Sequence, residues 1–211
     1  AGLTTPQTQS LLSIQIAALS TTAVGNLAST EVGVLTSTQF ASLTATQIGG
    51  LTVTHIPGLS TTQVASLSST QSQGLTGSQI AAFSADQIAA LGTTQLSSLG
   101  TGAVGGLLTT QIASLTTTQL SALNATQFAA LSADQTSAFA ASQILSLNAT
   151  QLSRISSTSV AALGSTILSA LTTTQIKGLT GAQIGSLTTT DIQALSTTQM
   201  AALSVGALAG I

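Results

Sequence analysis

The sequence contains no cysteine, tryptophan or tyrosine and has very few charged residues. Without cysteine, the chain can form neither disulfide bonds nor thiolate metal sites. Charged residues make up 3% of the chain, whereas they make up about a quarter of an ordinary soluble domain. Two basic side chains can neutralise few phosphates, so we expect no nucleic-acid partner. A chain rich in Thr, Ser, Ala, Leu, Gln, Ile and Gly is typical of secreted or surface-exposed repeat proteins.

Long apolar runs are also missing. No stretch approaches the roughly 18 apolar residues that a membrane helix needs, because Thr, Ser or Gln interrupts the chain every few residues. We therefore expect no transmembrane segment. Ala1 opens directly into a repeat, without a basic segment and an apolar core behind it, so we also expect no signal peptide within these residues.

A single eight-residue period runs through the chain. With Leu3 at position 1, residues 3–210 divide into 26 octads without insertion or deletion, and Ile211 begins another. The consensus Leu-Thr-Thr-Thr-Gln-Ile-Ala-Ala is followed closely by Leu115–Ala122. Position 5 is Gln in 18 octads, and position 6 is apolar in 23. We predict a single repeat array over residues 1–211 that continues or stacks beyond residue 211.

The octad pattern predicts one short helix per repeat. Position 2 is mostly Ser, Thr or Asn, the residues preferred at a helix N-cap. Gln follows three residues later, which completes a capping box. Positions 1 and 6 then become N′ and N4, whose apolar side chains form a hydrophobic staple. One frame thus accounts for all four consensus features.

The rare charged residues test this frame independently. Asp86 and Asp134 fall at N2, and Glu31 and Asp191 fall at N3. All four acids therefore lie in the first turn, where the helix dipole favours negative charge. The two bases, Lys177 at position 7 and Arg154 at position 8, are expected in the last turn, where the dipole favours positive charge.

Several residues fit the helical frame poorly. Pro57 falls at position 7 inside an expected helix, where it removes a backbone donor. Position 2 also holds some poor caps, namely Leu12, Ala28, Leu108 and Ala140. Because Thr favours strands, a β-solenoid remains the alternative to the helical fold.

Helices of six or seven residues are too short to persist alone in water, so neighbours must bury the Leu and Ile rows. That requirement predicts an all-α solenoid in which each unit packs on the next. The small residues at positions 7 and 8 would let adjacent coils approach closely. The number of octads in one coil does not follow from the sequence.

The run Leu-Thr-Thr-Thr-Gln-Ile-x-x-Leu resembles tracts in very large repetitive bacterial surface or secreted proteins, often described as adhesin-like or as haem-utilisation proteins. The resemblance covers the whole chain and implies an exported stalk, filament or matrix component. It transfers no functional residue, because the motif of those tracts is the repeat itself.

No candidate residue carries a catalytic, cofactor-binding or metal-binding expectation. His55 is the single histidine and replaces Gln at position 5, where it is most simply a substitute at N3. One histidine among many cap hydroxyls makes no catalytic triad. Asn124 and Asn148 begin Asn-Ala-Thr glycosylation sequons, but the N-cap role explains them equally well. Residues 100–106 are rich in glycine but lack the Lys-Ser/Thr of a phosphate-binding loop.

The sequence favours a structural repeat protein, located outside the cell or at its surface, that forms a filament, stalk or adhesin shaft by solenoid stacking. Its expected partners are other copies of itself, packed end to end or laterally, with no small-molecule substrate and no cofactor. The alternative is a module that binds ice or another ordered surface through regular Thr rows. We do not expect an enzyme.

Overall fold

The structure is a computed structural model that describes residues 3–210. Within these residues every octad forms one short helical segment, 25 of them α-helices and one a 3-10 helix, and none forms a strand. The predicted all-α solenoid of short capped helices is confirmed, and the β-solenoid alternative is excluded for this part of the chain.

The contacts of the chain divide it into two compact units, Ala1–Ser114 and Leu115–Ile211. The octad register runs through the sequence of both units, and the single continuous array stays a prediction. The helices of unit 1 are α1 (Thr5–Ser10), α2 (Ser13–Ala17), α3 (Thr21–Gly25), α4 (Ser29–Gly33), α5 (Ser37–Ala41), α6 (Ala45–Gly49), η1 (Ile56–Gly58), α7 (Thr61–Ala65), α8 (Ser69–Gln73), α9 (Gly77–Ala82), α10 (Ala85–Ala90), α11 (Thr93–Ser98), α12 (Thr101–Gly105) and α13 (Thr109–Ser114).

The helices of unit 2 are α14 (Thr117–Ser121), α15 (Ala125–Ala129), α16 (Ala133–Ser137), α17 (Ala141–Ser146), α18 (Ala149–Leu152), α19 (Ser157–Ala161), α20 (Gly164–Ala170), α21 (Thr173–Gly178), α22 (Gly181–Ile184), α23 (Thr189–Ala194), α24 (Thr197–Ala202) and α25 (Val205–Leu208).

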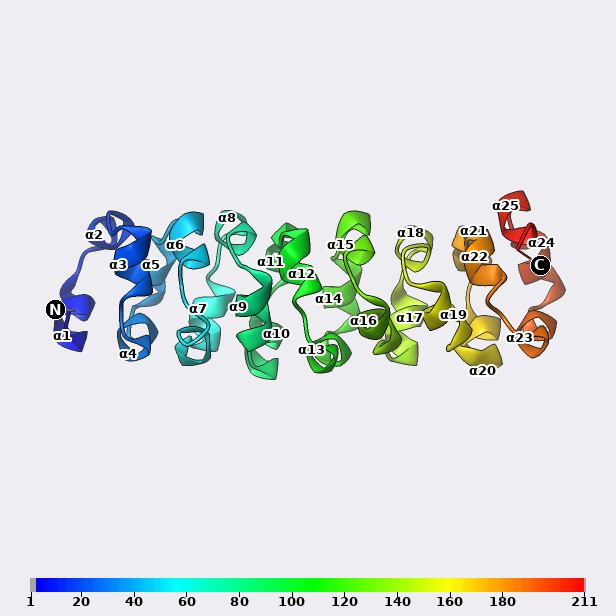
Figure 1. Cartoon of the computed structure of the whole chain (residues 1–211), viewed down its shortest axis with the longest axis horizontal. Helices are drawn as coiled ribbons and strands as arrows, with labels where there is room; N and C mark the ends of the chain where they lie inside the picture. The colour runs from blue at the N-terminus through cyan, green and yellow to red at the C-terminus, as the bar shows by residue number, and fades with distance from the viewer. Residues whose placement is uncertain (1–2, 211) are drawn as a thin grey trace. The chain divides into compact units, whose positions relative to one another are not determined.

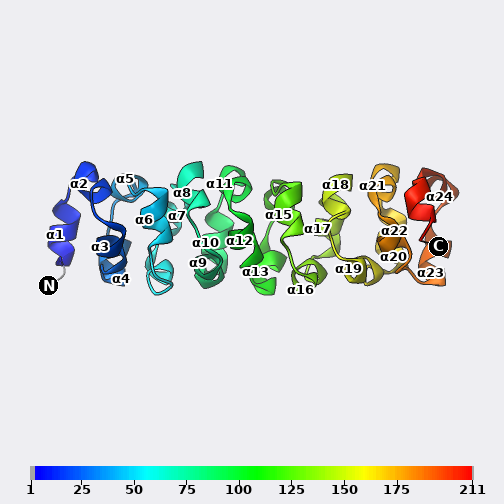
Figure 2. The same cartoon turned by 45° about the horizontal axis from the view of Figure 1, so that its top comes forward.

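Three octads complete one coil in each unit, because every helix packs beside the helix three octads later. In unit 2, α15, α18, α21 and α24 follow one another in one row, and α14, α17, α20 and α23 form another (Figure 1). The third row holds α16, α19, α22 and α25, and the rotated view of Figure 2 shows the same succession of helices. Unit 1 has the same three-row arrangement, with η1 in the place of an α-helix between α4 and α9.

The core of each unit is built from positions 1 and 6, as the staple predicted. Position-6 side chains such as Phe40, Ile80 and Leu152 are fully buried, and position-1 residues such as Leu91 and Leu123 are nearly so. A helix of five residues has little stability of its own, so the burial of these two rows supplies most of the stabilisation.

Small residues at positions 7 and 8 let successive coils approach closely, as expected. A Cβ atom added to Gly49 would lie 2.8 Å from the carbonyl oxygen of Gly74, one coil later. A Cβ atom on Gly106 would lie 2.3 Å from the Cα atom of Gly77. Such distances leave no room for a side chain, so these contacts are backbone against backbone.

Pro57 has the effect that its missing N–H predicts. Its octad forms no α-helix, and the chain instead makes the three-residue η1, with Pro57 in its first turn. Ile56 at position 6 is nevertheless fully buried. The octad therefore keeps its place in the core after losing its α-helix.

The charged residues lie where the frame places them, with one exception. Asp86 and Glu31 are in the first turns of their helices, and Lys177 is in the last turn of α21. The prediction for Arg154 is wrong, because α18 ends at Leu152 and Arg154 lies in the turn that follows. The N–H of Arg154 donates to the Gln151 carbonyl at 3.0 Å, so the last turn tightens to a three-residue spacing.

Among residues 3–210, no helix has both the length and the apolar character that crossing a membrane requires.

Candidate functional site: glutamine bridges between coils

Most position-5 glutamines are unusual polar residues because they are almost completely buried, whereas Gln95 is half-buried and Gln7 and Gln15 are exposed. Gln79 is 2% exposed and Gln127 is 1% exposed, values that are rare for this residue type. Each of these side chains stands in the first turn of its helix and points into the interface between successive coils. Both halves of the amide then need hydrogen-bond partners.

The amide oxygen of a buried glutamine takes part in the capping box predicted from the sequence. Gln79 Oε1 accepts from the backbone N–H of Thr76 at 2.8 Å, and the Gln79 N–H donates to the Thr76 hydroxyl at 3.3 Å. Where the cap residue is leucine or alanine, half of the box survives. Gln143 Oε1 still accepts from the N–H of Ala140 at 2.7 Å.

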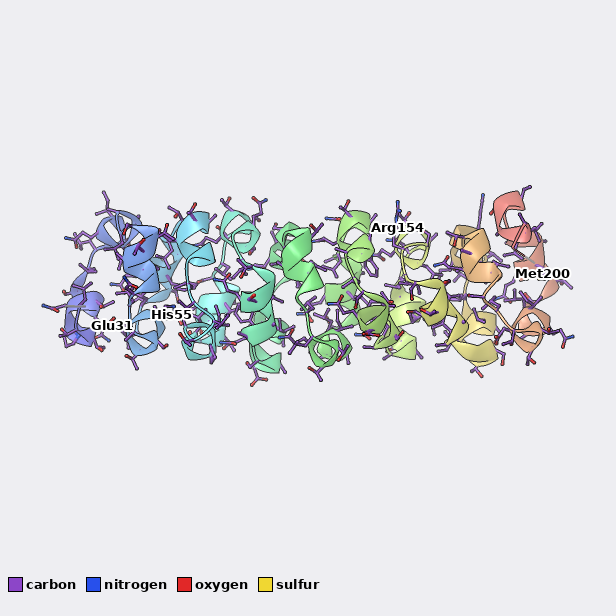
Figure 3. All side chains as sticks on the ribbon, viewed as in Figure 1. Glu31, His55, Arg154 and Met200 are labelled. Atoms are coloured by element: carbon purple, nitrogen blue, oxygen red, sulfur yellow. The ribbon has the colours of Figure 1, made fainter. Side chains whose placement is uncertain are left out.

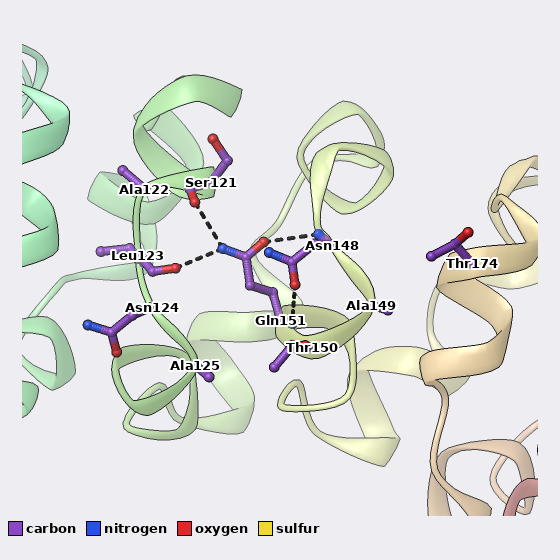
Figure 4. A pocket seen from close by; sticks show the side chains of 10 residues that line it. All are labelled: Ser121, Ala122, Leu123, Asn124, Ala125, Asn148, Ala149, Thr150, Gln151 and Thr174. Atoms are coloured by element: carbon purple, nitrogen blue, oxygen red, sulfur yellow. Dashed lines mark hydrogen bonds between the residues drawn. The ribbon is translucent and has the colours of Figure 1, made fainter.

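The nitrogen of the same amide reaches the preceding coil, which the sequence analysis missed. Gln79 Nε2 donates to the carbonyl of Leu51, 28 residues earlier, and to that of Ile48, 31 residues earlier, both at 2.7 Å. In unit 2, Gln151 Nε2 donates to the carbonyls of Leu123 at 2.7 Å and Ser121 at 3.1 Å (Figure 4). The position-1 carbonyl 28 residues earlier is likewise the acceptor for Gln39, Gln47, Gln63, Gln71, Gln87, Gln95, Gln111, Gln143, Gln175, Gln183 and Gln199.

This arrangement solves the main problem of a chain made of very short helices. The first four N–H groups and the last four carbonyls of any helix lack partners within the helix, so in a five-residue helix nearly every group is left over. Each bridging glutamine joins an N–H at the start of its own helix to one or more carbonyls at the end of an earlier one. The side chains are satisfied too, because no buried side-chain nitrogen or oxygen atom among the described residues lacks a hydrogen-bond partner.

His55 takes over both halves of the bridge, as its interpretation as a glutamine substitute predicted. Its Nδ1 accepts from the N–H of Thr52 at 2.9 Å, and its Nε2 lies 2.7 Å from the carbonyl oxygen of Leu27, 28 residues earlier. Only the tautomer with its proton on Nε2 satisfies both contacts. His55 is 3% exposed.

Three other octads show what happens when position 5 cannot bridge. Ser159 is too short, and its hydroxyl bonds to Thr136 at 2.7 Å, a polar residue that stands at a core position one coil earlier. The two polar replacements are therefore partners. Asp191 and Glu31 keep only the capping half, accepting from the N–H groups of Thr188 at 3.1 Å and Ala28 at 2.6 Å.

The charged residues and His55 do not form a common site. Within residues 3–210, no three His, Asp or Glu side chains gather as metal ligands would. Glu31 and His55 lie in unit 1, whereas Arg154 is an exposed residue of unit 2 (Figure 3). The absence of catalytic, cofactor and metal sites stays a prediction.

Both sequon asparagines lie at N-caps on one face of unit 2 (Figure 4). Asn124 Oδ1 accepts from the N–H groups of Thr126 and Gln127 at 3.0 Å, and Asn148 Oδ1 accepts from that of Gln151 at 2.9 Å. They flank a surface hollow whose other lining residues are Ser121, Ala122, Leu123, Ala125, Ala149, Thr150, Gln151 and Thr174. This lining offers amides, hydroxyls and carbonyls for hydrogen bonding and no ionisable group.

Comparison with known protein families agrees with this repeat. Residues 80–117 and residues 168–205 each match the family model described as the ALTTAQ repeat. The chain is a repeat protein. The letters of that description place a glutamine four residues after a leucine, as positions 1 and 5 of the octads do. No curated protein matches the chain significantly.

Proposed function

We propose that this chain is a structural protein, and not an enzyme, that forms an extracellular filament, stalk or adhesin shaft. The observation that carries the proposal is the glutamine bridge, which recurs at a constant offset of 28 residues within each unit. A bridge of this kind fixes the position of one coil on the next through backbone atoms. It serves an array that must stay regular over its length.

The surface supports the same proposal. Charged residues make up 3% of the chain, and the exposed positions are mainly Thr, Ser and Ala. Such a surface has little electrostatic attraction for nucleic acid or for charged partners, and little self-repulsion between copies. It suits a shaft that packs against further copies of itself.

Negative-stain microscopy of the purified chain over a wide concentration range tests the proposal. We expect particles that lengthen into filaments as the concentration rises. Short, dispersed monomers at every concentration would contradict the filament. Antibodies against the chain should label intact cells of the source organism as strongly as permeabilised ones, and labelling that needs permeabilisation would contradict the extracellular location.

A second candidate function is binding to ice or another ordered surface, favoured by exposed threonine rows. In unit 2, the position-4 residues of α15, α18, α21 and α24 are Thr126, Thr150, Thr174 and Thr198, all exposed on helices that lie side by side. A thermal-hysteresis assay tests this function, with Thr150→Lys/Thr174→Lys as the variant that should lose it. No hysteresis in the unmodified chain would remove the candidate.

A further inference from the structure

Two of the three asparagines of the chain occupy the same place in two successive coils of unit 2. Asn124 is the N-cap of α15 and Asn148 is the N-cap of α18, and these two helices pack side by side. Both asparagines are exposed and line the hollow of Figure 4. Each is followed by alanine and threonine, so both form the glycosylation sequon Asn-Ala-Thr. Neighbouring helices of one row therefore present two identical acceptor sequences.

The two ends of each asparagine amide have different surroundings. Asn124 Oδ1 accepts from the N–H groups of Thr126 and Gln127. Asn148 Oδ1 accepts from the N–H of Gln151. Within residues 3–210 neither Nδ2 group donates a hydrogen bond, so the capping role uses the oxygen alone. Ser or Thr is the cap of most other octads, and its hydroxyl is its only side-chain polar atom. An asparagine cap differs because it keeps a free nitrogen for a second role.

The other residues of the two sequons leave this nitrogen accessible. Thr126 and Thr150 are exposed, and neither hydroxyl makes a hydrogen bond within the described part of the chain. The middle residues, Ala125 and Ala149, carry only a methyl group, so neither can cover the amide. A modifying enzyme that recognises the sequon can therefore reach both the amide and the hydroxyl two residues later.

We propose that Asn124 and Asn148 are sites of N-linked glycosylation. Nδ2 attacks C1 of a sugar that is activated as the phosphate ester of a nucleotide or a lipid. The C1–N bond forms as the C1–O bond to phosphate breaks, the phosphate leaves with the electron pair, and the nitrogen loses one proton. Oδ1 keeps the lone pairs that cap the helix, so both helices persist. The inference rests on the proposed extracellular location, because such sequons are acceptors in secreted proteins.

Sugars at these two positions would change the face of unit 2 that carries α15 and α18. Charged residues make up 3% of the chain, so little electrostatic repulsion keeps copies apart. A bulky, solubilising group on two successive coils directs packing between copies to other faces. It also covers the row that begins with Thr126 and Thr150, so a modified chain could not use that row to bind an ordered surface.

Mass spectrometry of the chain purified from its source organism tests the modification. The mass reference is the same sequence made in a host without N-glycosylation. We expect added sugar mass, which fragmentation by electron transfer should place on Asn124 and Asn148. Asn124→Ser/Asn148→Ser should carry no sugar although serine keeps the cap. Thr126→Ala/Thr150→Ala should also carry none, although both asparagines remain, and circular dichroism checks that both variants fold.

A third acceptor tests whether the exposed cap position is the basis of the modification. Thr172 is the N-cap of α21, the next helix of the row after α18, and Thr174 is exposed two residues later. Thr172→Asn therefore creates an equivalent sequon and keeps the cap, and we expect a third sugar. The control Thr172→Ser should add none. A third sugar missing from Thr172→Asn would overturn the exposed cap position as the basis of the modification.

The outcomes separate the modification from the proposed function. An extracellular chain that forms filaments at the reference mass would overturn the modification and leave the proposed function standing. Sugar on both asparagines of a chain that forms no filaments would support the modification and contradict the filament. A chain found only inside cells, at the reference mass, would overturn both, and sugar found only on Ser or Thr hydroxyls would overturn the two sites.

The same measurement distinguishes the two sugar donors. Sugar already present on chains that have not been exported would indicate a nucleotide donor. Sugar present only on exported chains would indicate a lipid donor. Either result supports the two sites.

Discussion

Two octads depart most from the repeat, and the chain compensates for them in opposite ways. Octad 51–58 of unit 1 loses its α-helix to Pro57 but keeps both halves of the bridge through His55. Octad 163–170 of unit 2 has Ile167 at position 5 and therefore no bridge, and its helix α20 is seven residues long. The two octads thus contain the shortest and the longest helical segments among the described residues.

The longer helix of the second octad follows from an early start. α20 begins at Gly164, which has a φ of +71°, and Leu163 has helical dihedrals (ψ −32°), whereas position-1 residues such as Leu147 and Leu171 are extended. Because ψ sets the direction of the carbonyl, the Leu163 carbonyl points away from the usual bridging direction. The residue 28 positions later is Asp191, which has no amide to donate. Asp191 therefore occupies a position from which a glutamine amide could not reach the Leu163 carbonyl. The early start of α20 and the loss of the bridge to Leu163 thus have the same cause.

The largest change in the free energy of unfolding should come from replacing the position-5 amide by an acid in one octad, compared with the reverse replacement in the next octad. Gln183 is a normal bridge, donating to Leu152 at 2.9 Å and Ile155 at 2.8 Å. Gln183→Asp removes the donor of the Ile155 carbonyl and one of the two donors of the Leu152 carbonyl, which also accepts from the N–H of Ile155. It also places a carboxylate where the amide donated, and we expect a loss of about 3 kcal/mol in the free energy of unfolding. The matched exchange Asp191→Gln should change it by less than about 0.5 kcal/mol, the usual range for a change that breaks no such interaction. Urea unfolding followed by circular dichroism measures both, and equal effects would contradict the role assigned to Leu163.

The next largest loss of stability should come from substituting His55. His55→Leu removes the acceptor for Thr52 and the donor for Leu27, and we expect a loss of about 2 kcal/mol. His55→Gln restores the consensus bridge and should leave the unfolding midpoint nearly unchanged. If the glutamine variant were as unstable as the leucine variant, the imidazole would have a role beyond bridging.

Substitution of Gly164 should destabilise the chain only through the conformation of the backbone. A Cβ atom there would meet nothing within 4 Å, but the positive φ makes any other residue unfavourable, so Gly164→Ala should cost about 1 kcal/mol. The control is Gly102→Ala in α12, where a Cβ atom also meets nothing and φ is not positive. That change should stabilise the chain by about 0.5 kcal/mol, because alanine favours the helix. Opposite signs in the two thermal unfolding midpoints are the expected result.

Part of this structure can be predicted from the sequence. The cap, the glutamine three residues later and the staple are local features, so they predict each helix and the two buried rows. The second half of the bridge joins residues 28 apart, and neither the helix period nor the capping rules reach that distance. One signal was present nevertheless. A capping box accepts Glu as readily as Gln, yet 18 octads have Gln and one has Glu, which indicates that the amide donor is used as well.

Other features could not be predicted because they depend on how coils stack. The three-octad coil follows from side-by-side packing of the rows, which the octad pattern does not specify. The pairing of Ser159 with Thr136 cannot be predicted without the coil length, because only a coil of three octads makes these two residues neighbours. The early start of α20 depends on the positive φ of Gly164, and glycine at position 2 of other octads, such as Gly92, adopts an ordinary N-cap conformation.

The smallest change in the free energy of unfolding should come from substituting Pro57, the residue that removes the α-helix of octad 51–58. Pro57→Ala restores a backbone N–H and lets η1 extend toward an α-helix, a gain that the greater freedom of the unfolded chain largely offsets. We expect a change of less than about 0.5 kcal/mol with a small increase in helical circular dichroism signal. A loss above about 1 kcal/mol would mean that the 3-10 segment itself stabilises unit 1. A small effect here, beside a large one for His55→Leu, would establish that the bridge, rather than the helix, holds an octad in its coil.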